Sequence, residues 1–523
     1  MAVPGLAKNI GQLLEDSAAR FGDKELLYFH HDERSFTYRQ LNSQVNQYAA
    51  VLQQAGIKQG SHLAIMLPNC PEFFLVWLAL ARIGGVAVPL NTRYQVDDLE
   101  YVLNDSDATG LIIDAEFASV FRDAQTKVPN VKTVFTVGSG AEDLGKDITL
   151  LAPEMSGEFK LVSLSLDDLM SIQYTSGTTG FPKGCLLPHE YWLTLGFVAS
   201  ENMIEEDRFL CVEPFYYMDP PWELIMCMLK GMTMVVARSY SPSGFMPLIR
   251  QYGITVSWAL LPLWILKQPE SPQDKEHNLR VLLAGAIPKT IHKPFEDRFN
   301  VPLREGYGMT EIGPGIMMPF EDAHMSGSGS VGIPSNYRTV KIVSDDGQEA
   351  PKGEIGELWV TGPGMFKGYY KKAEATGEAF EGEWFKTGDL FRQDELDYYY
   401  IVGRKKDMIK RAGDNIAASE VEAVLLSHPG ILSAAVVAVP DLDRKEEVKA
   451  YIIPAQGETS ETVSPSVIIE FCKSKLAEFK IPRYIEYKQE FPVTPTGKIR
   501  KPILLKEKED LASGCYDRLS EKG

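Results

Sequence analysis

The segment Tyr174-Thr-Ser-Gly-Thr-Thr-Gly-Phe-Pro-Lys-Gly184 combines three glycines with several small hydroxyl side chains and ends in Pro-Lys-Gly. Glycine lets the backbone bend toward a ligand, and free N–H groups in such a loop can hold phosphate oxygens. It is not a Walker A loop, because Gly-x-x-x-x-Gly-Lys-[Ser/Thr] does not occur in the chain. The segment follows an apolar run, which favours a phosphate-binding loop over the alternative, a solvated linker. The candidate ligands are Thr175, Ser176, Gly177, Thr178, Thr179, Gly180 and Lys183.

On both sides of this loop, short apolar runs alternate with segments of helical spacing. Residues 62–67, 110–113 and 281–284 predict buried strands, and residues 41–52 predict a helix. The apolar run 73–90 is interrupted by Arg82 and two glycines, so it predicts a buried helix followed by a strand rather than a membrane span. Strands that alternate with helices predict an α/β fold whose mainly parallel sheets are covered by helices.

The pattern changes in the last third of the chain. Residues 331–403 hold short strand-like runs broken by Gly, Pro and Asp-Gly, which predicts a barrel-like β section. The polar run Arg404–Asp407 predicts an exposed connection between domains. Beyond it, Ser419-Glu-Val-Glu422 predicts a capping box that opens a helix. We therefore predict a large N-terminal domain, 1–404, and a small α+β domain, 405–523.

Composition narrows the class of protein. The 523 residues are 44% hydrophobic and carry a formal net charge of −18, which argues against nucleic acid as a partner. The six cysteines are scattered without metal-ligand spacing, so we expect reduced thiols. The N-terminus has no charged region followed by an apolar core, and the expected location is the cytoplasm.

The loop at 174–184 resembles the signature loop of the adenylate-forming superfamily, which includes acyl-CoA synthetases, luciferases and the adenylation domains of peptide synthetases. The resemblance extends through nearly the whole chain and is nearest to the carnitine/betaine–CoA ligases. It implies an ATP-dependent acid–CoA ligase that forms an acyl-adenylate and then transfers the acyl group to coenzyme A. The implied cofactors and partners are ATP, Mg²⁺, coenzyme A and a carboxylic acid.

Two further segments resemble the nucleotide-binding motifs of this superfamily. In Glu305-Gly-Tyr-Gly-Met-Thr-Glu311, the aromatic face of Tyr307 suits adenine, Thr310 can donate to a phosphate, and Glu311 can hold Mg²⁺ as an oxygen ligand. The resemblance also places Gly285 and Ala286 beside the base. The candidate nucleotide ligands here are Gly285, Ala286, Glu305, Gly306, Tyr307, Gly308 and Thr310, with Glu311 for the metal.

Other positions acquire roles only through the resemblance. Asp389 in Thr387-Gly-Asp389 would accept hydrogen bonds from the ribose hydroxyls, with Arg404 as its companion. Lys406 matches the hinge about which a mobile lid domain turns, Lys410 matches a residue of the thioester-forming conformation, and Gly413 matches the pantetheine tunnel. Ala412 departs from the Gly-Gly pair expected there.

A lysine near the end of the chain completes the set. Pro495-Thr-Gly-Lys498 resembles the final motif of the superfamily, a turn that presents one lysine. Adenylation builds negative charge around the α-phosphate, and Lys498 would stabilise that charge where it develops. The candidate catalytic residues are thus Lys498, Thr310, Glu311, Lys406 and Lys410.

The acid substrate is expected to bind a group of aromatic and acidic residues. The acyl site is expected at Tyr216, Tyr217, Asp219, Trp222 and Trp258, where aromatic faces accompany acidic groups such as Glu223. Such a set suits a quaternary ammonium head and hence a short or zwitterionic, carnitine-like acid. A medium-chain acid, an aryl acid, an enzyme that loads a carrier protein and a non-catalytic nucleotide sensor are the alternatives. The oligomeric state, monomer or homodimer, stays open.

Overall fold

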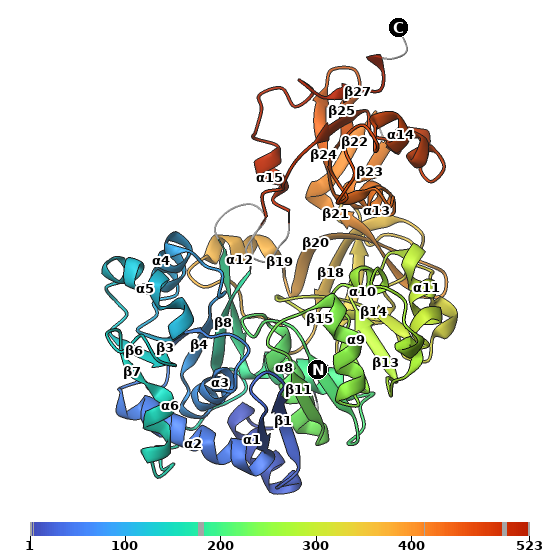
Figure 1. Cartoon of the computed structure of the whole chain (residues 1–523). Helices are drawn as coiled ribbons and strands as arrows, with labels where there is room; N and C mark the ends of the chain where they lie inside the picture. Colours follow the sequence, from blue (N-terminus) through green and yellow to red (C-terminus); the bar gives the residue numbers. More distant parts are fainter. Residues whose placement is uncertain (1–2, 4, 176–181, 413, 494–498, 521–523) are drawn as a thin grey trace. The chain divides into compact units, whose positions relative to one another are not determined.

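A computed structural model of the chain describes Val3 and residues 5–175, 182–412, 414–493 and 499–520. The chain divides into two compact units. The larger unit comprises residues up to Thr175, Pro182–Val340 and Val360–Phe385, and the smaller one contains Lys341–Trp359 and residues from Lys386 onward. The expected α/β class is confirmed in the larger unit, where two sheets are built mainly from parallel strands (Figure 1).

The first sheet carries the hairpin of the signature loop. Its order is β7-β6-β5-β3-β4-β8-β9, and all pairs are parallel except β8–β9. Its strands are β3 (His62–Met66), β4 (Val86–Pro89), β5 (Gly110–Asp114), β6 (Thr133–Val137), β7 (Lys146–Asp147), β8 (Leu169–Thr175) and β9 (Lys183–Pro188). Its helices are α2 (Tyr38–Gln54), α3 (Pro71–Ile83), α4 (Val96–Asp105), α5 (Ala118–Ala124) and α6 (Ile148–Leu151).

The second sheet has nine strands in the order β16-β15-β14-β13-β12-β10-β11-β1-β2, with antiparallel pairs toward both edges. The strands are β1 (Glu25–Phe29), β2 (Arg34–Thr37), β10 (Arg208–Cys211), β11 (Thr233–Val236), β12 (Val256–Trp258), β13 (Val281–Ala284), β14 (Leu303–Met309), β15 (Gly313–Met317) and β16 (Ile333–Pro334). The accompanying helices are α1 (Ile10–Phe21), α7 (His189–Ser200), α8 (Asp219–Lys230), α9 (Pro242–Gln251), α10 (Pro262–Leu266) and α11 (Lys289–Phe299).

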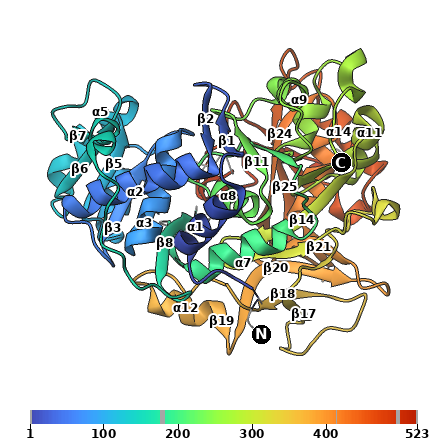
Figure 2. The same ribbon diagram turned by 90° about the horizontal axis from the view of Figure 1, so that it is seen from below.

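Helices α1, α3 and α8 lie between the two sheets (Figure 2). Every residue of α3 is buried. A helix that is apolar on all sides has to be covered on all sides, so the run that starts at Phe73 forms a core helix, and β4 follows it as expected. Among the described residues, no helix has the length and apolar content that crossing a bilayer requires.

The predicted barrel-like β section is a five-stranded sheet with the order β17-β18-β20-β19, in which β21 also pairs with β20. Its elements are β17 (Thr339–Val343), β18 (Ile355–Thr361), β19 (Phe380–Glu381), β20 (Trp384–Gln393) and β21 (Tyr399–Arg404), with helix α12 (Ala373–Ala379) before β19. The pairs β19–β20 and β20–β21 are antiparallel.

A fourth sheet, with six strands, forms the core of the smaller unit. It contains β22 (Met408–Arg411), β23 (Asp414–Ala417), β24 (Ile431–Asp441), β25 (Lys445–Pro454), β26 (Tyr484–Tyr487) and β27 (Tyr516–Asp517). Helices α13 (Ala418–Leu426) and α14 (Pro465–Lys473) pack on it through Val421, Leu425 and Ile468, and α15 (Lys501–Leu504) follows. The two strands expected around 434–439 and 449–453 are confirmed as β24 and β25.

The expected capping box at Ser419–Glu422 is wrong. Helix α13 begins at Ala418, and its N-cap, Ala417, makes no side-chain cap. Ser419 donates instead to the carbonyl of Val402, and Glu422 accepts from the Val436 amide at 2.7 Å and pairs with Lys501 at 2.8 Å. Tertiary partners therefore use both side chains that a capping box needs.

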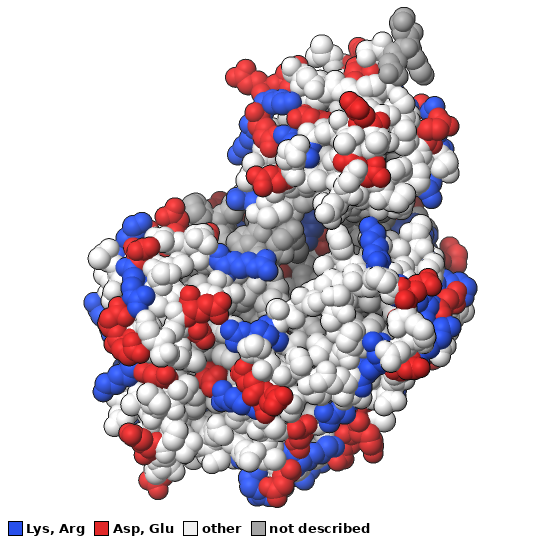
Figure 3. Space-filling view, in the orientation of Figure 1, with Lys and Arg blue, Asp and Glu red and all other residues white. Residues whose placement is uncertain are grey.

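The surface is charged with both signs. Acidic and basic side chains are interspersed over the face drawn in Figure 3. Although the net charge is −18, the acidic residues form no single patch on that face. All six cysteines are free thiols, and Cys70 and Cys185 are buried as packing residues.

Candidate active site

The signature loop connects the antiparallel strands β8 and β9, with Thr175 paired to Lys183. The Thr175 hydroxyl donates to the Lys183 carbonyl at 3.4 Å, which closes the base of the loop. The predicted ligands Ser176, Gly177, Thr178, Thr179 and Gly180 lie outside the described residues. The described part therefore places the two ends of the loop at the end of one hairpin.

Tyr369 connects Lys183 to the predicted metal ligand. The Lys183 ammonium lies 4.8 Å from the centre of the Tyr369 ring, and the Tyr369 hydroxyl donates to Glu311 Oε1 at 2.8 Å. Glu311 is 7% exposed, and its backbone carbonyl accepts from the Phe366 amide. Burial and the Glu311 carboxylate raise the pKa of Tyr369, so the phenol stays protonated as a donor. Lys183 and Glu311, which the sequence predicts as phosphate and metal ligands, thus both contact the side chain of Tyr369.

Sequence reasoning missed Tyr369. It forms an isolated bridge with Cys185, which lies two residues after Lys183 on β9. No spacing in the sequence indicates this pairing, because the two residues are 184 positions apart. The antiparallel pairing of the tyrosine segment with β9 is a tertiary contact.

Strand β14 carries the second nucleotide motif. It lies beside β13 in parallel register, with Ala284 opposite Glu305. The Glu305 carboxylate accepts from the Ile287 amide at 3.0 Å, and burial raises the pKa of Glu305 to about 8. This contact ties the β13 end, where Ala286 has a φ of +55°, to β14. The structure therefore brings Gly285 and Ala286 together with the motif, as predicted.

Space at this strand end suits a flat ligand. A Cβ added to Gly285 would meet only the Gly306 carbonyl, at 3.7 Å. Gly306 and Gly308 are constrained instead, since their Cβ atoms would lie 2.5 Å from Met317 Sδ and from the Gly313 carbonyl. Tyr307 is nearly buried and Thr310 half-buried at the end of the motif.

In the smaller unit, Asp389 and Arg404 form the predicted pair. They face each other across β20 and β21, and Arg404 Nε lies 2.8 Å from Asp389 Oδ1. Asp389 is buried, and its amide donates to the Thr387 hydroxyl, which in turn donates to the Leu358 carbonyl. Antiparallel pairing thus brings together two residues that are 15 positions apart.

Lys406 lies in a single 3-10 turn, Lys405–Asp407, directly after β21. Burial lowers its pKa, whereas its neighbour Lys405 pairs with Glu357 at 3.2 Å. Lys405 therefore anchors the turn, and among the described residues no salt bridge holds Lys406, the lysine that matches the hinge.

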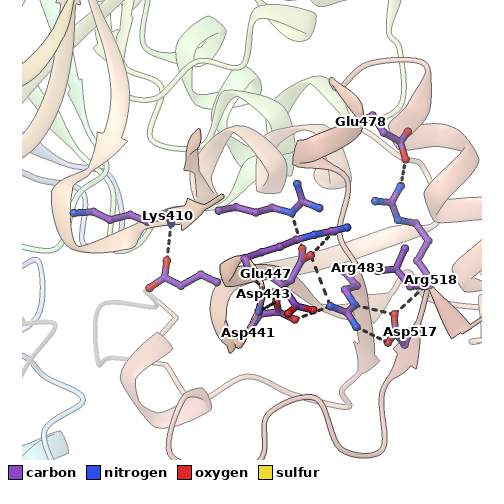
Figure 4. Close-up of polar contacts among 12 residues, drawn as sticks. Lys410, Asp441, Asp443, Glu447, Glu478, Arg483, Asp517 and Arg518 are labelled. Carbon is purple, nitrogen blue, oxygen red and sulfur yellow. Dashed lines mark hydrogen bonds and ion pairs between the residues drawn. The ribbon is translucent and has the colours of Figure 1, made fainter. Parts of the chain in front are cut away.

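Lys410 is exposed on β22, and its amide donates to the Glu446 carboxylate. Figure 4 shows its ammonium end directed away from a cluster of ion pairs that joins the strands of this unit. In that cluster Arg411 and Arg444 both lie 2.7 Å from Glu447, and Arg483 pairs with Asp441 and Asp517. Gly413 and Lys498 lie outside the described residues.

The predicted acid-binding residues come together in the larger unit. The rings of Tyr216 and Tyr217 are 4.7 Å apart, and those of Trp222 and Trp258 are 6.4 Å apart at 79°. The indole N–H of Trp222 donates to Asp219 at 3.4 Å. A Cβ on Gly306 would lie 3.3 Å from the Trp258 ring, so this aromatic set adjoins the nucleotide motif.

Comparison with known proteins places this geometry in a family. The AMP-binding enzyme family matches residues 14–370, and the AMP-binding enzyme C-terminal domain family matches residues 420–498. The crotonobetaine/carnitine–CoA ligase of Salmonella typhimurium is 34% identical over 517 residues, which is 95% of this chain and 99% of the relative.

Solved structures agree. An anthranilate–CoA ligase, AuaEII, in complex with anthranoyl-AMP has a TM-score of 0.87 at 26% identity, covering 96% of this chain and 98% of its own. ATP-bound MatB from Rhodopseudomonas palustris has a TM-score of 0.84 at 26% identity, covering 97% and 100%. The chain belongs to the AMP-binding enzyme family. It is an acyl-CoA synthetase, a ligase that works through an acyl-adenylate.

Proposed function

We propose that the enzyme uses Mg·ATP to activate a short or zwitterionic carboxylic acid and transfers the acyl group to coenzyme A. The acid carboxylate attacks the α-phosphorus and pyrophosphate leaves; the CoA thiolate then attacks the acyl carbonyl and AMP leaves. Positioning and charge stabilisation suffice for the first step, so no protein nucleophile is required. The observation that carries the proposal is that Lys183 and Glu311 both contact Tyr369: the lysine lies over its ring, and the carboxylate accepts from its hydroxyl.

The nucleotide is held by groups of known chemistry. The loop at Thr175–Lys183 and Thr310 bind the phosphates, Tyr307 and the Gly285–Ala286 strand end accept the adenine, and Asp389 accepts the ribose hydroxyls. Glu311 is an oxygen ligand of the kind that Mg²⁺ prefers, and bound Mg²⁺ supplies charge neutralisation at the phosphates. A synthetase for o-succinylbenzoate with TM-score 0.82 was solved in complex with ATP and magnesium.

The two half-reactions need different groups. Lys498 stabilises the charge of the adenylation step, and Lys410 with Gly413 serves thioester formation. We propose that residues 405–523 act as a mobile lid that turns about Lys406 between the steps. The exposed position of Lys410 on β22 supports its availability to a substrate. The six free thiols support a reducing compartment, the cytoplasm.

A zwitterionic acid is supported by the aromatic and acidic residues around Trp222 and by the name of the Salmonella relative. Pyrophosphate release across carnitine-like zwitterions, short fatty acids, medium-chain acids and aryl acids tests this class. The highest kcat/KM is expected for a zwitterion. A higher value for a medium-chain or aryl acid would assign the enzyme to that class, and faster turnover with a carrier-protein thiol than with coenzyme A would change the acceptor.

Replacing Tyr369 by phenylalanine keeps the ring under Lys183 and removes the hydrogen bond to Glu311. Since a hydrogen bond to a charged group contributes about 1.5–3 kcal/mol, we expect adenylation to fall by about 10- to 100-fold. The Mg²⁺ concentration for half-maximal rate should rise, measured by acid-dependent ATP–pyrophosphate exchange. Tyr370→Phe is the matched control, because Tyr370 donates to Asp107 instead. An unchanged Mg²⁺ requirement in Tyr369→Phe would remove Tyr369 from the site.

A further inference from the structure

Three buried side chains with acidic or thiol groups converge where β10 ends. Cys211 is the last residue of β10, Glu213 follows two residues later, and Glu223 lies on α8. Their ligand atoms, one from each residue, all lie within 4.8 Å of one another. Glu223 has no exposed surface and Glu213 is 3% exposed. Two carboxyl groups are therefore held together inside the larger unit.

This cluster has unsatisfied polar atoms. In the described part of the chain, neither carboxyl oxygen of Glu223 has a hydrogen-bond partner. The charges that act on Glu223 come from Glu213 and Asp219, which are also acidic. Burying a carboxyl group without a partner is costly, and native proteins leave few such groups unpaired. Apart from the Cys211 thiol, a weak donor, no described group offsets this burial, so the position suits a ligand that brings positive charge.

Two further unpaired atoms belong to residues that contact the predicted acid-binding set. The indole N–H of Trp258 and the side-chain carbonyl of Gln173 also lack partners among the described residues, and the Gln173 amide donates to the Tyr216 carbonyl. Trp222 precedes Glu223 on α8 and pairs with Trp258, whose ring adjoins Gly306 of the nucleotide motif. The cluster thus borders the aromatic set that adjoins β14.

We propose that Glu223 and Glu213 bind the permanently charged trialkylammonium head of the acid, with Trp222 and Trp258 as its aromatic wall. A quaternary nitrogen has no N–H to donate, so negative charge and aromatic faces are the groups that recognise it. This inference rests on the proposed function and deepens it. It assigns selection of the acid to two carboxyl groups. In the described part of the chain, neither carboxyl group forms a hydrogen bond with a residue of the nucleotide motifs.

Binding of the cation is coupled to loss of a proton. Burial and the nearby Asp219 raise the pKa of Glu213 to about 8, and burial with Glu213 and Asp219 raises that of Glu223. The neighbouring groups Cys211, Cys227 and Tyr240 have pKa values raised chiefly by burial and stay neutral. Without ligand Glu213 is therefore mostly protonated below pH 8, and a bound cation stabilises the ionised form of the carboxyl groups.

The test compares two acids that differ only in charge: 4-(trimethylammonio)butanoate and its neutral carbon isostere, 5,5-dimethylhexanoate. Acyl-CoA formation by the full-length enzyme gives kcat/KM for each acid. The wild type should prefer the cation. In Glu223→Gln and Glu213→Gln this preference should fall by about 30-fold or more, since removing one partner of a buried charge pair costs at least about 2 kcal/mol. Activity with the neutral isostere should persist, which shows that the variants fold.

Glu201→Gln is the matched control, because Glu201 is exposed and contacts Asn336. It should leave the preference unchanged. A wild type that prefers the zwitterion while both variants keep that preference would overturn the inference and leave the proposed function standing. A wild type that prefers 5,5-dimethylhexanoate would overturn the zwitterionic class and the inference together. A tightly held metal ion that is lost in Glu223→Gln would assign the cluster to a metal instead.

The pH profile gives a second readout. As the pH rises toward 8, a larger fraction of Glu213 is ionised, so KM for the cationic acid should fall while KM for the neutral isostere stays level. Glu213→Gln should flatten the difference. Parallel profiles for both acids in the wild type would contradict the assignment of the two carboxyl groups.

Discussion

Glu311→Gln should lose acid-dependent ATP–pyrophosphate exchange by about 100- to 1,000-fold, the range seen when a group that stabilises transition-state charge is removed. The carboxylate is buried and accepts from Tyr369 at 2.8 Å, so its position is set before substrate binds. An amide has nearly the same shape but no negative charge for the metal. The loss should therefore come from Mg·ATP chemistry rather than from misfolding.

Two measurements distinguish a loss of Mg·ATP chemistry from misfolding. Thioester formation from a preformed acyl-adenylate needs no pyrophosphate departure and should survive in Glu311→Gln. Asp274→Asn is a control for loss of a buried carboxylate, since Asp274 pairs with Arg298 at 2.7 Å on the larger unit. It should lower thermal stability without lowering exchange. Exchange at the wild-type rate in Glu311→Gln would exclude Glu311 as the metal ligand.

Lys498→Ala should slow the first half-reaction by orders of magnitude and spare the second. The ammonium group is proposed to stabilise charge that develops during adenylation, which again corresponds to about 100- to 1,000-fold in rate. Thioester formation from synthetic acyl-adenylate involves no such charge and should stay within severalfold of the wild type. ATP–pyrophosphate exchange and the release of acyl-CoA from the adenylate are the two assays.

Lys506→Ala is the control for this variant, because Lys506 is exposed in the same C-terminal segment. It should leave both half-reactions unchanged. Equal losses of both half-reactions in Lys498→Ala would contradict a lid that presents different groups in the two steps. Retention of both would exclude Lys498 from catalysis.

The fold class followed from local patterns. Parallel sheets, the core helix that contains Phe73, the β section and the two long strands of the smaller unit were all expected from apolar spacing. The capping box at Ser419 failed because Glu422 is held by Lys501 and Val436, partners that local spacing cannot indicate. A real capping box, between Thr37 and Gln40, opens α2.

For the candidate site, the sequence likewise predicted the residues within short motifs but not those that distant segments contribute. Motifs that bind phosphate or adenine work through a few adjacent residues, so Lys183, Tyr307 and Glu311 could be named from short segments. Tyr369 could not, since it reaches Glu311 across 58 positions. Glu213 was missed as well, because a carboxyl group after an apolar strand is usually solvated and only packing against α8 buries it.

The sequence by itself thus determined the family and the class of reaction and predicted the nucleotide-binding groups, because these depend on the chemistry and spacing of neighbouring residues. The tertiary structure decided which distant side chains share an environment: Tyr369 with Glu311, Asp389 with Arg404, and Glu213 with Glu223. Strand order and helix packing bring these pairs together, and burial then raises the pKa values of Glu213 and Glu223, the two carboxyl groups that we propose select the acid.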